Sequence, residues 1–562
     1  MGIRKKTSNI ANSILSLSKN NKILDMMNSM LKMLTMLLIL VFVLYPFLSV
    51  FGKALYIDGK INFSGFAFLK DESYLIRNSI LSATITALFS TVFALALGLM
   101  TFFVTERQKK IIMFILLLTM VSPPFIGSLT YIELFGRNGF ITKNILKLSI
   151  NPYGIWGIVS VQTLGYTSLN AVLLIGYLDS FDNTMIESAK SLRANTTSIL
   201  LDIIIPLIKP AIAVCFLLSF IRSMADFSTP MIIGGAFNTL ATESYLSIIA
   251  KGNSARASAM SILLFIPSII VFIIYSHFLK QQQSASKNLR ETKVRMKKTG
   301  LYHVIKVLAL LFILWLIIQY LAIFTSAITD KYKGETYFTL NNIKDSVPYI
   351  KDSFLRSIIY SIIAGIFASL IGLILSFYSY IMKSKPMKVL DFISNMPYIV
   401  PGTFFGLGYV LAFNKGPLKL TGTVAIVILN LIFRQLPMSI RTIQNSMTQI
   451  EESTLNSAKD LGAHNLYILK DMIFPMSFSG LFLSFTNAFI SSMTTIGSII
   501  FLVYPSRKLA TFVLFDLVSS GKYKIASVLS CVIIIVCLSV SLLSRRLFDR
   551  SSRDVFTSKE FN

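Results

Sequence analysis

Apolar runs of about 20 residues alternate with short polar or basic segments along almost the whole chain. A run of this length is what a helix needs to cross the hydrocarbon core of a bilayer. The pattern predicts an all-α, polytopic membrane protein with about 12 transmembrane helices. We expect them at about 34–50, 77–104, 111–134, 154–178, 206–228, 257–279, 303–325, 353–382, 388–413, 422–446, 476–500 and 523–543.

Lysine and arginine gather in alternate loops, which assigns the two sides of the membrane by the positive-inside rule. Six crossings return the chain to its starting side, so the two halves of six helices are predicted to be parallel repeats. The predicted divisions are a cytoplasmic N-terminal segment at 1–33, a first half at 34–279, a basic cytoplasmic linker at 280–302, a second half at 303–543 and a cytoplasmic tail at 544–562.

Composition narrows the class of function. The chain is 54% hydrophobic and 14% charged, and its net charge of +27 lies at membrane ends rather than on a nucleic-acid-binding domain. Neither a phosphate-binding loop nor a nucleophile-and-base constellation occurs, so we expect no enzyme activity and no cofactor bound by this chain. The cysteines and histidines are too scattered to indicate a disulfide framework or a metal site; they are Cys215, Cys531, Cys537, His277, His303 and His464.

One polar segment occurs twice at a constant offset of 269 residues. In each copy a helix-favouring stretch leads into an apolar run that opens with proline, a residue tolerated in the first turn of a helix. Each copy therefore predicts a short helix outside the bilayer, a turn and a membrane helix. The first copy contains Glu187, Ser188, Ala189, Arg193 and Pro206, and the second contains Asn456, Ser457, Ala458, Gly462 and Pro475.

These two segments resemble the cytoplasmic loop of bacterial ABC import permeases, which reads Glu-Ala-Ala, three residues, Gly, nine residues, Ile-x-Leu-Pro. The resemblance implies a type I ABC importer permease fold in the cytoplasmic (inner) membrane, with both termini cytoplasmic. It also implies partners: two copies of an ATPase subunit that binds ATP and Mg, and an extracytoplasmic solute-binding protein. The alternative is that the two segments only mark a duplicated membrane protein without an ATPase.

Arg193 departs from this pattern because it occupies the glycine position that Gly462 keeps. Glycine suits a helix end since it reaches positive φ without strain. We therefore expect the first loop to dock with somewhat different geometry.

Ionisable residues inside membrane spans are costly and therefore mark candidate path positions. Glu133, Arg222, Asp226 and Arg434 are such residues, each with a buried structural ion pair or a headgroup contact as the alternative. Arg222 and Asp226 are spaced as an i,i+4 pair that can neutralise itself on one helix.

Proline and glycine indicate broken helices at the centre of each half. Pro123, Pro124 and Gly127 lie in the third span, and Pro397, Pro401, Gly402, Gly406 and Gly408 lie in the ninth. Non-helical backbone at membrane depth is tolerated where it lines a cavity. The alternative is that these glycines only let helices pack closely.

Two further stretches, 225–230 and 397–402, look like the fused permeases of ferric-iron importers and equally like their relatives for 2-aminoethylphosphonate. The expected function is the permease of an ABC importer, with ferric iron as the first candidate solute and 2-aminoethylphosphonate or another small solute as the second. Thiamine, polyamine and sulfate-type solutes are more distant. An ion-gradient-driven secondary transporter and a lipid-handling or structural membrane protein are the alternatives of other classes.

Overall fold

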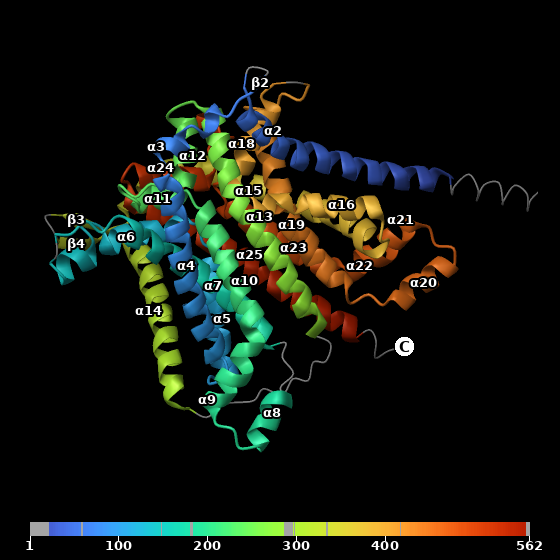
Figure 1. Ribbon diagram of the computed structural model, residues 1–562, viewed down its shortest axis with the longest axis horizontal. Coiled ribbons are helices and arrows are strands. Elements are labelled where there is room, and N and C mark those ends of the chain that lie inside the picture. Colours follow the sequence, from blue (N-terminus) through green and yellow to red (C-terminus); the bar gives the residue numbers. More distant parts are fainter. Residues whose placement is uncertain are drawn as a thin grey trace, which may run out of the picture.

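The computed structural model describes residues 22–57, 60–147, 149–179, 184–285, 296, 298–332, 335–415 and 417–557, and helices make up most of them (Figure 1). Within these residues nine helices are long and apolar enough to cross a bilayer, and three bent helix pairs bring the number to twelve. The predicted all-α fold with about 12 spans is confirmed.

The first half begins with a helix at Lys22–Leu55, which includes η1 (Leu40–Leu44) and α2 (Tyr45–Leu55). The elements that follow are β1 (Tyr56–Ile57), β2 (Lys60–Ile61), η2 (Ser64–Phe66), α3 (Phe68–Asp71), α4 (Tyr74–Met100), α5 (Glu106–Met120), α6 (Phe125–Phe135), η3 (Phe140–Ile145), α7 (Ile155–Asp179), α8 (Thr184–Ser191), α9 (Thr196–Ser198), η4 (Ile199–Ile204), α10 (Ile205–Ala225), α11 (Ser228–Ile233), α12 (Leu240–Ile249) and α13 (Ser254–Ala285).

The second half repeats this order. Its elements are α14 (Gly300–Ile328), β3 (Thr329–Tyr332), β4 (Glu335–Phe338), α15 (Asn341–Ser376), η5 (Phe377–Ile381), α16 (Lys385–Ser394), α17 (Met396–Ile399), α18 (Gly402–Phe413), α19 (Val424–Met447), α20 (Glu452–Asp460), α21 (Asn465–Tyr467), η6 (Ile468–Ile473), α22 (Phe474–Met476), α23 (Phe478–Thr494), η7 (Pro505–Arg507), α24 (Ala510–Ser519) and α25 (Tyr523–Thr557).

Several helix boundaries in the structure differ from the predicted ones. The first helix already begins at Lys22, and α13 continues to Ala285 inside the predicted linker. The predicted outer loop at 326–352 is shorter than expected, because β3 and β4 form an antiparallel hairpin and α15 begins at Asn341. Residues 1–21 of the N-terminal segment, most of the linker and residues 558–562 of the tail lie outside the described residues.

Three spans are bent, two of them where proline predicted a break. The chain turns by 98° between α5 and the helical segment Phe125–Ile145, and by 113° between Lys385–Ile399 and α18. Pro123 and Pro401 lie in these breaks, which is expected because proline removes a donor and clashes with the preceding turn. The third bend, of 72° at Ser477, was not predicted.

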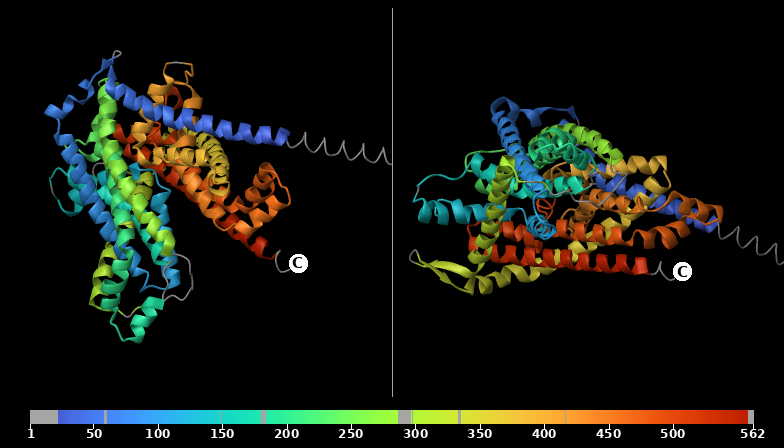
Figure 2. Two further views of the ribbon diagram at one scale, coloured as in Figure 1. Left: turned by 45° about the vertical axis from the view of Figure 1, so that its right-hand side comes forward. Right: turned by 90° about the horizontal axis from the view of Figure 1, so that it is seen from below.

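The first helix of each half packs against helices of the other half. The Tyr409 hydroxyl of α18 donates to the Phe42 carbonyl at 2.8 Å, and the Phe42 ring stacks on Phe433 of α19. In the reciprocal contact, Phe312 of α14 packs on Phe93 of α4 with ring centroids 5.9 Å apart. The two halves are therefore interlocked, and the crossing of the first helix over the later elements is visible in Figure 2.

The two repeated loops lie at one end of their bundles. In Figure 1, α8 is at the lower end of the first-half helices and α20 is at the lower right end of the second-half helices. The short elements α11, α12 and α24 lie at the opposite end. The N-terminal helix starts beside the second loop, since His464 Nε2 lies 3.1 Å from the Asp25 carboxylate.

Candidate functional site

The two repeated loops share one backbone conformation. Arg193 has φ 61° and Gly462 has φ 78°, so both lie in the left-handed region. Each residue donates its N–H to the carbonyl three residues before it, Lys190 or Lys459, at 2.9 Å. The two loops therefore have the same backbone at this turn, because arginine adopts the glycine conformation rather than avoiding it. A difference in docking geometry stays a prediction.

The hydrogen bonds around this turn also repeat. Ala194 donates to the Ala189 carbonyl and Ala463 donates to the Ala458 carbonyl, both at 3.0 Å. These bonds satisfy the carbonyls that a helix end leaves open. The alanines of both motifs therefore hold the turn through their backbones.

Side-chain caps start the next helix in both copies. Asn195 accepts from the Ser198 N–H at 2.7 Å, and His464 Nδ1 accepts from the Leu466 N–H at 3.2 Å. A six-residue π-helical segment follows in each copy, η4 and η6. The repeat therefore extends through all elements up to the two prolines.

After the prolines the two copies diverge. Pro206 lies in the first turn of α10, which runs on to Ala225 despite a second proline at position 210. Pro475 lies in the three-residue α22, and the chain bends at Ser477 before α23. The two loops thus have the same shape but join their bundles differently.

The loops present one polar face outward and pack one apolar face inward. Glu187, Ser188, Asn456 and Ser457 are exposed, whereas Ala189 is 8% exposed and packs in a cluster with residues of η4. Burial of Ala189 explains why a small residue is suited to that position.

Two exposed leucines were missed by sequence reasoning. Leu192 is 84% exposed and Leu461 is 87% exposed, and they are equivalent residues, each just before the left-handed position. The 269-residue offset was the available signal for them. A single exposed apolar side chain is ordinary on a protein surface, so it is the recurrence of leucine at the same position of both loops that singles these two residues out.

A cavity of about 480 Å³ lies between the two halves. Four breaks in helices converge on it: the α5–α6 and α10–α11 breaks of the first half, and the α17–α18 break and the end of α23 in the second half. Backbone outside helices is therefore found where it lines a cavity, as expected at membrane depth.

Glycines near the second-half break allow close packing. A Cβ on Gly406 would lie 2.4 Å from the Ser498 carbonyl oxygen, and a Cβ on Gly402 would lie 3.0 Å from the backbone of Gly497. Both alternatives therefore apply at this break: Gly402 lines the cavity and also packs closely, whereas Gly406 only allows close packing.

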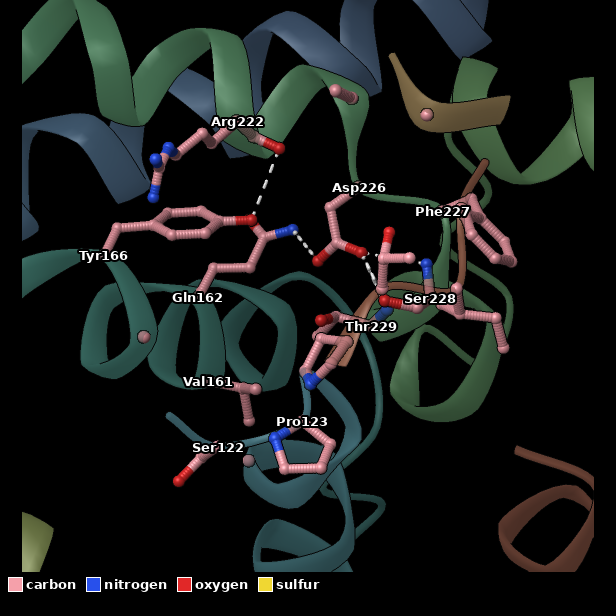
Figure 3. Close-up of a pocket in the computed structure, with 18 of the residues that line it drawn as sticks. Ser122, Pro123, Val161, Gln162, Tyr166, Arg222, Asp226, Phe227, Ser228 and Thr229 are labelled. Atoms are coloured by element: carbon pink, nitrogen blue, oxygen red, sulfur yellow. Dashed lines mark hydrogen bonds between the residues drawn. The ribbon is translucent and has the colours of Figure 1, made fainter. Parts of the chain in front are cut away.

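Asp226 is held by four hydrogen bonds rather than by Arg222 (Figure 3). Its carboxylate accepts from Gln162 Nε2 at 3.0 Å, from the N–H and Oγ of Ser228 at 2.9 and 2.6 Å, and from the Thr229 N–H at 3.2 Å. Because α10 ends at Ala225, Asp226 no longer continues the helix that carries Arg222. The expected i,i+4 pair does not form between these described residues.

Gln162 connects this network to two other helices and was also missed by sequence reasoning. Its amide oxygen accepts from Ser223 Oγ at 2.5 Å and from Thr86 Oγ1 at 3.2 Å. The signal available in the sequence was a glutamine inside an otherwise apolar run. Gln162 therefore fixes the position of Asp226 relative to α4 and α10.

Arg222 and Arg434 both line the cavity, one from each half. The Arg434 guanidinium donates to the Pro397 carbonyl and, at 3.1 Å, to the Val400 carbonyl, which the break before α18 leaves open. Thr495, the uncharged counterpart of Asp226 in the second half, lines the cavity too. The charges are therefore distributed asymmetrically.

Glu133 does not line the cavity. Its carboxylate accepts from Ser326 Oγ of α14 at 3.1 Å and pairs with Lys524 Nζ of α25 at 3.5 Å. The structural ion pair, stated as the alternative for this residue, is what the structure contains. Sequence reasoning gathered four residues for the path, and the cavity brings together Arg222, Asp226 and Arg434.

No group of three or more His, Cys, Asp or Glu side chains with the geometry of a metal site occurs in the described part of the chain. A resident metal centre therefore has no ligand set among these residues. This finding concerns a metal ion held permanently by the protein, not iron as a transported solute.

Comparison with known proteins identifies the architecture. The family described as "binding-protein-dependent transport system inner membrane component" matches twice, at residues 92–282 and 368–555. Among relatives, the ferric transport system permease protein FbpB of Actinobacillus pleuropneumoniae is 28% identical over 520 residues, 89% of this chain and 75% of that protein.

Two more relatives are also described as transport system permeases. A Haemophilus influenzae protein described as a ferric transport system permease (FbpB 1) is 30% identical over 481 residues, 82% of this chain and 76% of the relative. A Salmonella typhi protein described as a 2-aminoethylphosphonate transport system permease (PhnV) is 24% identical over 249 residues, 43% of this chain and 94% of the relative. With one family match in each half, the chain belongs to the inner membrane components of binding-protein-dependent transport systems, as a fused two-half permease of the ABC importer type.

Proposed function

We propose that this chain supplies both membrane halves of an ABC importer and that the loops containing α8 and α20 dock on two copies of an ATPase subunit. The observation that carries the proposal is the repeated loop itself. Its two copies share the left-handed residue, the hydrogen bonds of the turn and an exposed leucine at the same position. Two equal docking elements suit two equal ATPase copies.

The mechanism follows from the connections of these loops. Each loop runs directly into a membrane helix, α10 or the bent pair of α22 and α23, whose far end reaches the cavity. Closure of the ATPase copies on ATP would move the two loops together, and the attached helices would carry that movement to the breaks around the cavity. The cavity would then open toward the binding protein.

The sides of the membrane follow from the same proposal. The two loops face the cytoplasm, the N-terminal helix begins on that side beside His464, and both termini are cytoplasmic. The elements α11, α12 and α24 then face the extracytoplasmic binding protein, which delivers the solute.

Ferric iron is the first candidate solute, because two relatives that span most of this chain are described as ferric transport permeases. 2-Aminoethylphosphonate is the second, supported by a weaker match to one half. In such a system the binding protein is expected to carry most of the specificity.

The docking proposal is tested by replacing the exposed leucines with aspartate. Leu192→Asp and Leu461→Asp, separately and together, leave the permease core unaltered because both side chains lie outside it. An apolar anchor in a partner's pocket contributes about 2 kcal/mol, so each change is expected to weaken ATPase binding roughly 30-fold. The measurement is the amount of ATPase subunit that co-purifies with the permease.

The matched control is Ile61→Asp, which places the same charge on an exposed apolar residue of the β1–β2 hairpin, 70% exposed and at the other end of the first helix. This variant should retain the ATPase subunit. Equal retention of the subunit by the double leucine variant would refute docking through these loops.

A further inference from the structure

We propose that the solute crosses the cavity as an anion or an anionic complex, and that Arg222 is the residue that binds its oxygen atoms. This inference rests on the proposed function in taking the cavity as the transport path. It adds the charge of the species that crosses this cavity, on which the relatives' names do not agree, since they give a ferric and a phosphonate solute.

The first reason to expect an anion is the charge of the cavity wall. Its lining contains two arginines, Arg222 and Arg434, and one aspartate, Asp226, with no other formally charged side chain among the lining residues. A wall with this balance attracts anions and repels cations, and the effect is stronger away from bulk water.

Asp226 is not free to bind a cation. Four donors already occupy its carboxylate, two of them backbone N–H groups at the start of α11. A metal ion would have to displace bonds that hold the α10–α11 break in shape. The one carboxylate of the cavity therefore serves the protein's own backbone.

Arg434 is likewise engaged, but it keeps its charge. Its guanidinium satisfies the carbonyls of Pro397 and Val400 at the second-half break. It is a positioning residue for that break and adds a positive field to the cavity.

Arg222 differs from both. Its guanidinium makes no hydrogen bond or ion pair with any described residue, although the side chain lines the cavity and is only partly exposed. Figure 3 shows the guanidinium pointing away from Asp226. An unpaired guanidinium inside a membrane protein is costly, and it matches carboxylate, phosphate or phosphonate oxygens in a bidentate fork.

Neutral polar groups surround the same space. Tyr398 is 40% exposed, and Thr119 and Ser122 contribute hydroxyls to the lining. Gln319 presents an amide that donates or accepts according to how it is turned. The hydroxyls of Thr119 and Ser122 already donate to the Leu116 and Leu118 carbonyls, so they can only accept. Tyr398 and Gln319 are the groups that add donors for oxygen atoms that Arg222 does not reach.

Bare ferric ion favours carboxylate and phenolate oxygens. The one carboxylate of the wall is occupied, and two of its three phenols, Tyr166 and Tyr320, are hydrogen-bonded to the Arg222 carbonyl and to Ser122. The ion would also meet two guanidinium groups, so it fits this wall poorly. Iron is therefore expected to cross while still held by anionic ligands. A phosphonate needs no such carrier. The shared chemistry is a cluster of anionic oxygens, and the two solutes are the two possible sources of it.

The experiment compares four forms of the gene in native cells from which it has been deleted: wild type, Arg222→Gln, Arg222→Lys and Arg77→Gln. Arg77 is the matched control, since it is an exposed arginine of α4 outside the cavity lining. Uptake of radiolabelled iron supplied as ferric citrate and of labelled 2-aminoethylphosphonate is measured per amount of permease in the membrane.

Loss of a charge-assisted bond predicts that Arg222→Gln lowers uptake roughly tenfold or more. Arg222→Lys, which keeps the charge but not the fork, should fall between wild type and Arg222→Gln, and Arg77→Gln should equal wild type. The solute whose uptake falls identifies the source of the oxygens. Unchanged or faster uptake by Arg222→Gln would overturn the proposal, since a cation gains from removal of a positive charge.

A second readout does not depend on transport. Thermal unfolding of the purified full chain is followed with citrate, phosphate, 2-aminoethylphosphonate or putrescine. At least one of the anions should raise the midpoint for wild type and raise it less for Arg222→Gln or Arg222→Lys, while the cation putrescine should not. Absence of an anion effect in wild type would overturn the inference, whereas absence of gene-dependent uptake in cells would count against the proposed function instead.

Discussion

At the scale of single residues, the left-handed turn is the feature that the two loops have in common. An L-residue with a side chain reaches this conformation at a cost of about 1–2 kcal/mol, and Arg193 adopts it where Gly462 does so freely. The hydrogen bonds of the turn are the same in both copies. The surrounding loop therefore imposes the conformation, and the residue type changes only its cost.

Replacement of Gly462 with alanine measures that cost. No atom lies within 4 Å of a Cβ at this position, so strain in the backbone is the main effect, and we expect a loss of about 1 kcal/mol in stability. Thermal unfolding of the purified protein is the measurement. Gly300→Ala is the control, because a Cβ there also meets no atom but φ is not positive; equal effects of the two changes would contradict the account.

At the scale of helices, one ion pair joins three elements from both halves. Glu133 of α6 accepts from Ser326 of α14 and pairs with Lys524 of α25, and both charged side chains are less than a quarter exposed. A partly buried pair of this kind is expected to hold the halves together more strongly than a surface pair.

A double-mutant cycle tests this expectation. Glu133→Ala and Lys524→Ala, alone and combined, should show a coupling energy of about 1 kcal/mol in thermal unfolding. The control cycle uses Lys383 and Glu452, which are 66% and 75% exposed and should couple more weakly, because water screens an exposed pair. If the exposed pair couples as strongly as the partly buried pair, burial is not the cause.

The control pair also has a defined pH dependence. The hydrogen bond from Lys383 holds the pKa of Glu452 below its usual value. Any stability from this pair is therefore present above the unfolded-state pKa of the carboxyl group and is lost as the pH falls through the lower folded-state pKa. Both cycles are accordingly run at neutral pH.

Local chemistry explains which elements could be predicted from the sequence. Proline at 123 and at 397–401 marked two of the three bends, because its effect on a helix needs no tertiary partner. The bend at Ser477, the swap of the first helices and the Gln162 network depend on contacts between distant segments. The sequence shows Gln162 as a polar residue in an apolar run, but it does not show which distant residues this side chain, the bend and the first helices contact.

At the scale of the whole molecule, interlocked halves, equal loops at one end and a cavity between the halves form one coupled system. Each loop is joined through a membrane helix to a break at the cavity. In the proposed function, a movement of the loops would reach the proposed solute path through these helices. The repeated loop was predictable because a duplication leaves the same spacing twice in the sequence. For the cavity, the sequence indicated broken helices and candidate path residues, but not that residues of both halves meet around one space.

The central claim is that ATP hydrolysed by a partner drives uptake through this chain. The most direct measurement is gene-dependent uptake of labelled iron and labelled 2-aminoethylphosphonate under two conditions: ion gradients collapsed at constant ATP, and ATP depleted with gradients kept. We predict that uptake persists in the first condition and stops in the second. Uptake that stops with the gradient and survives loss of ATP would contradict the account.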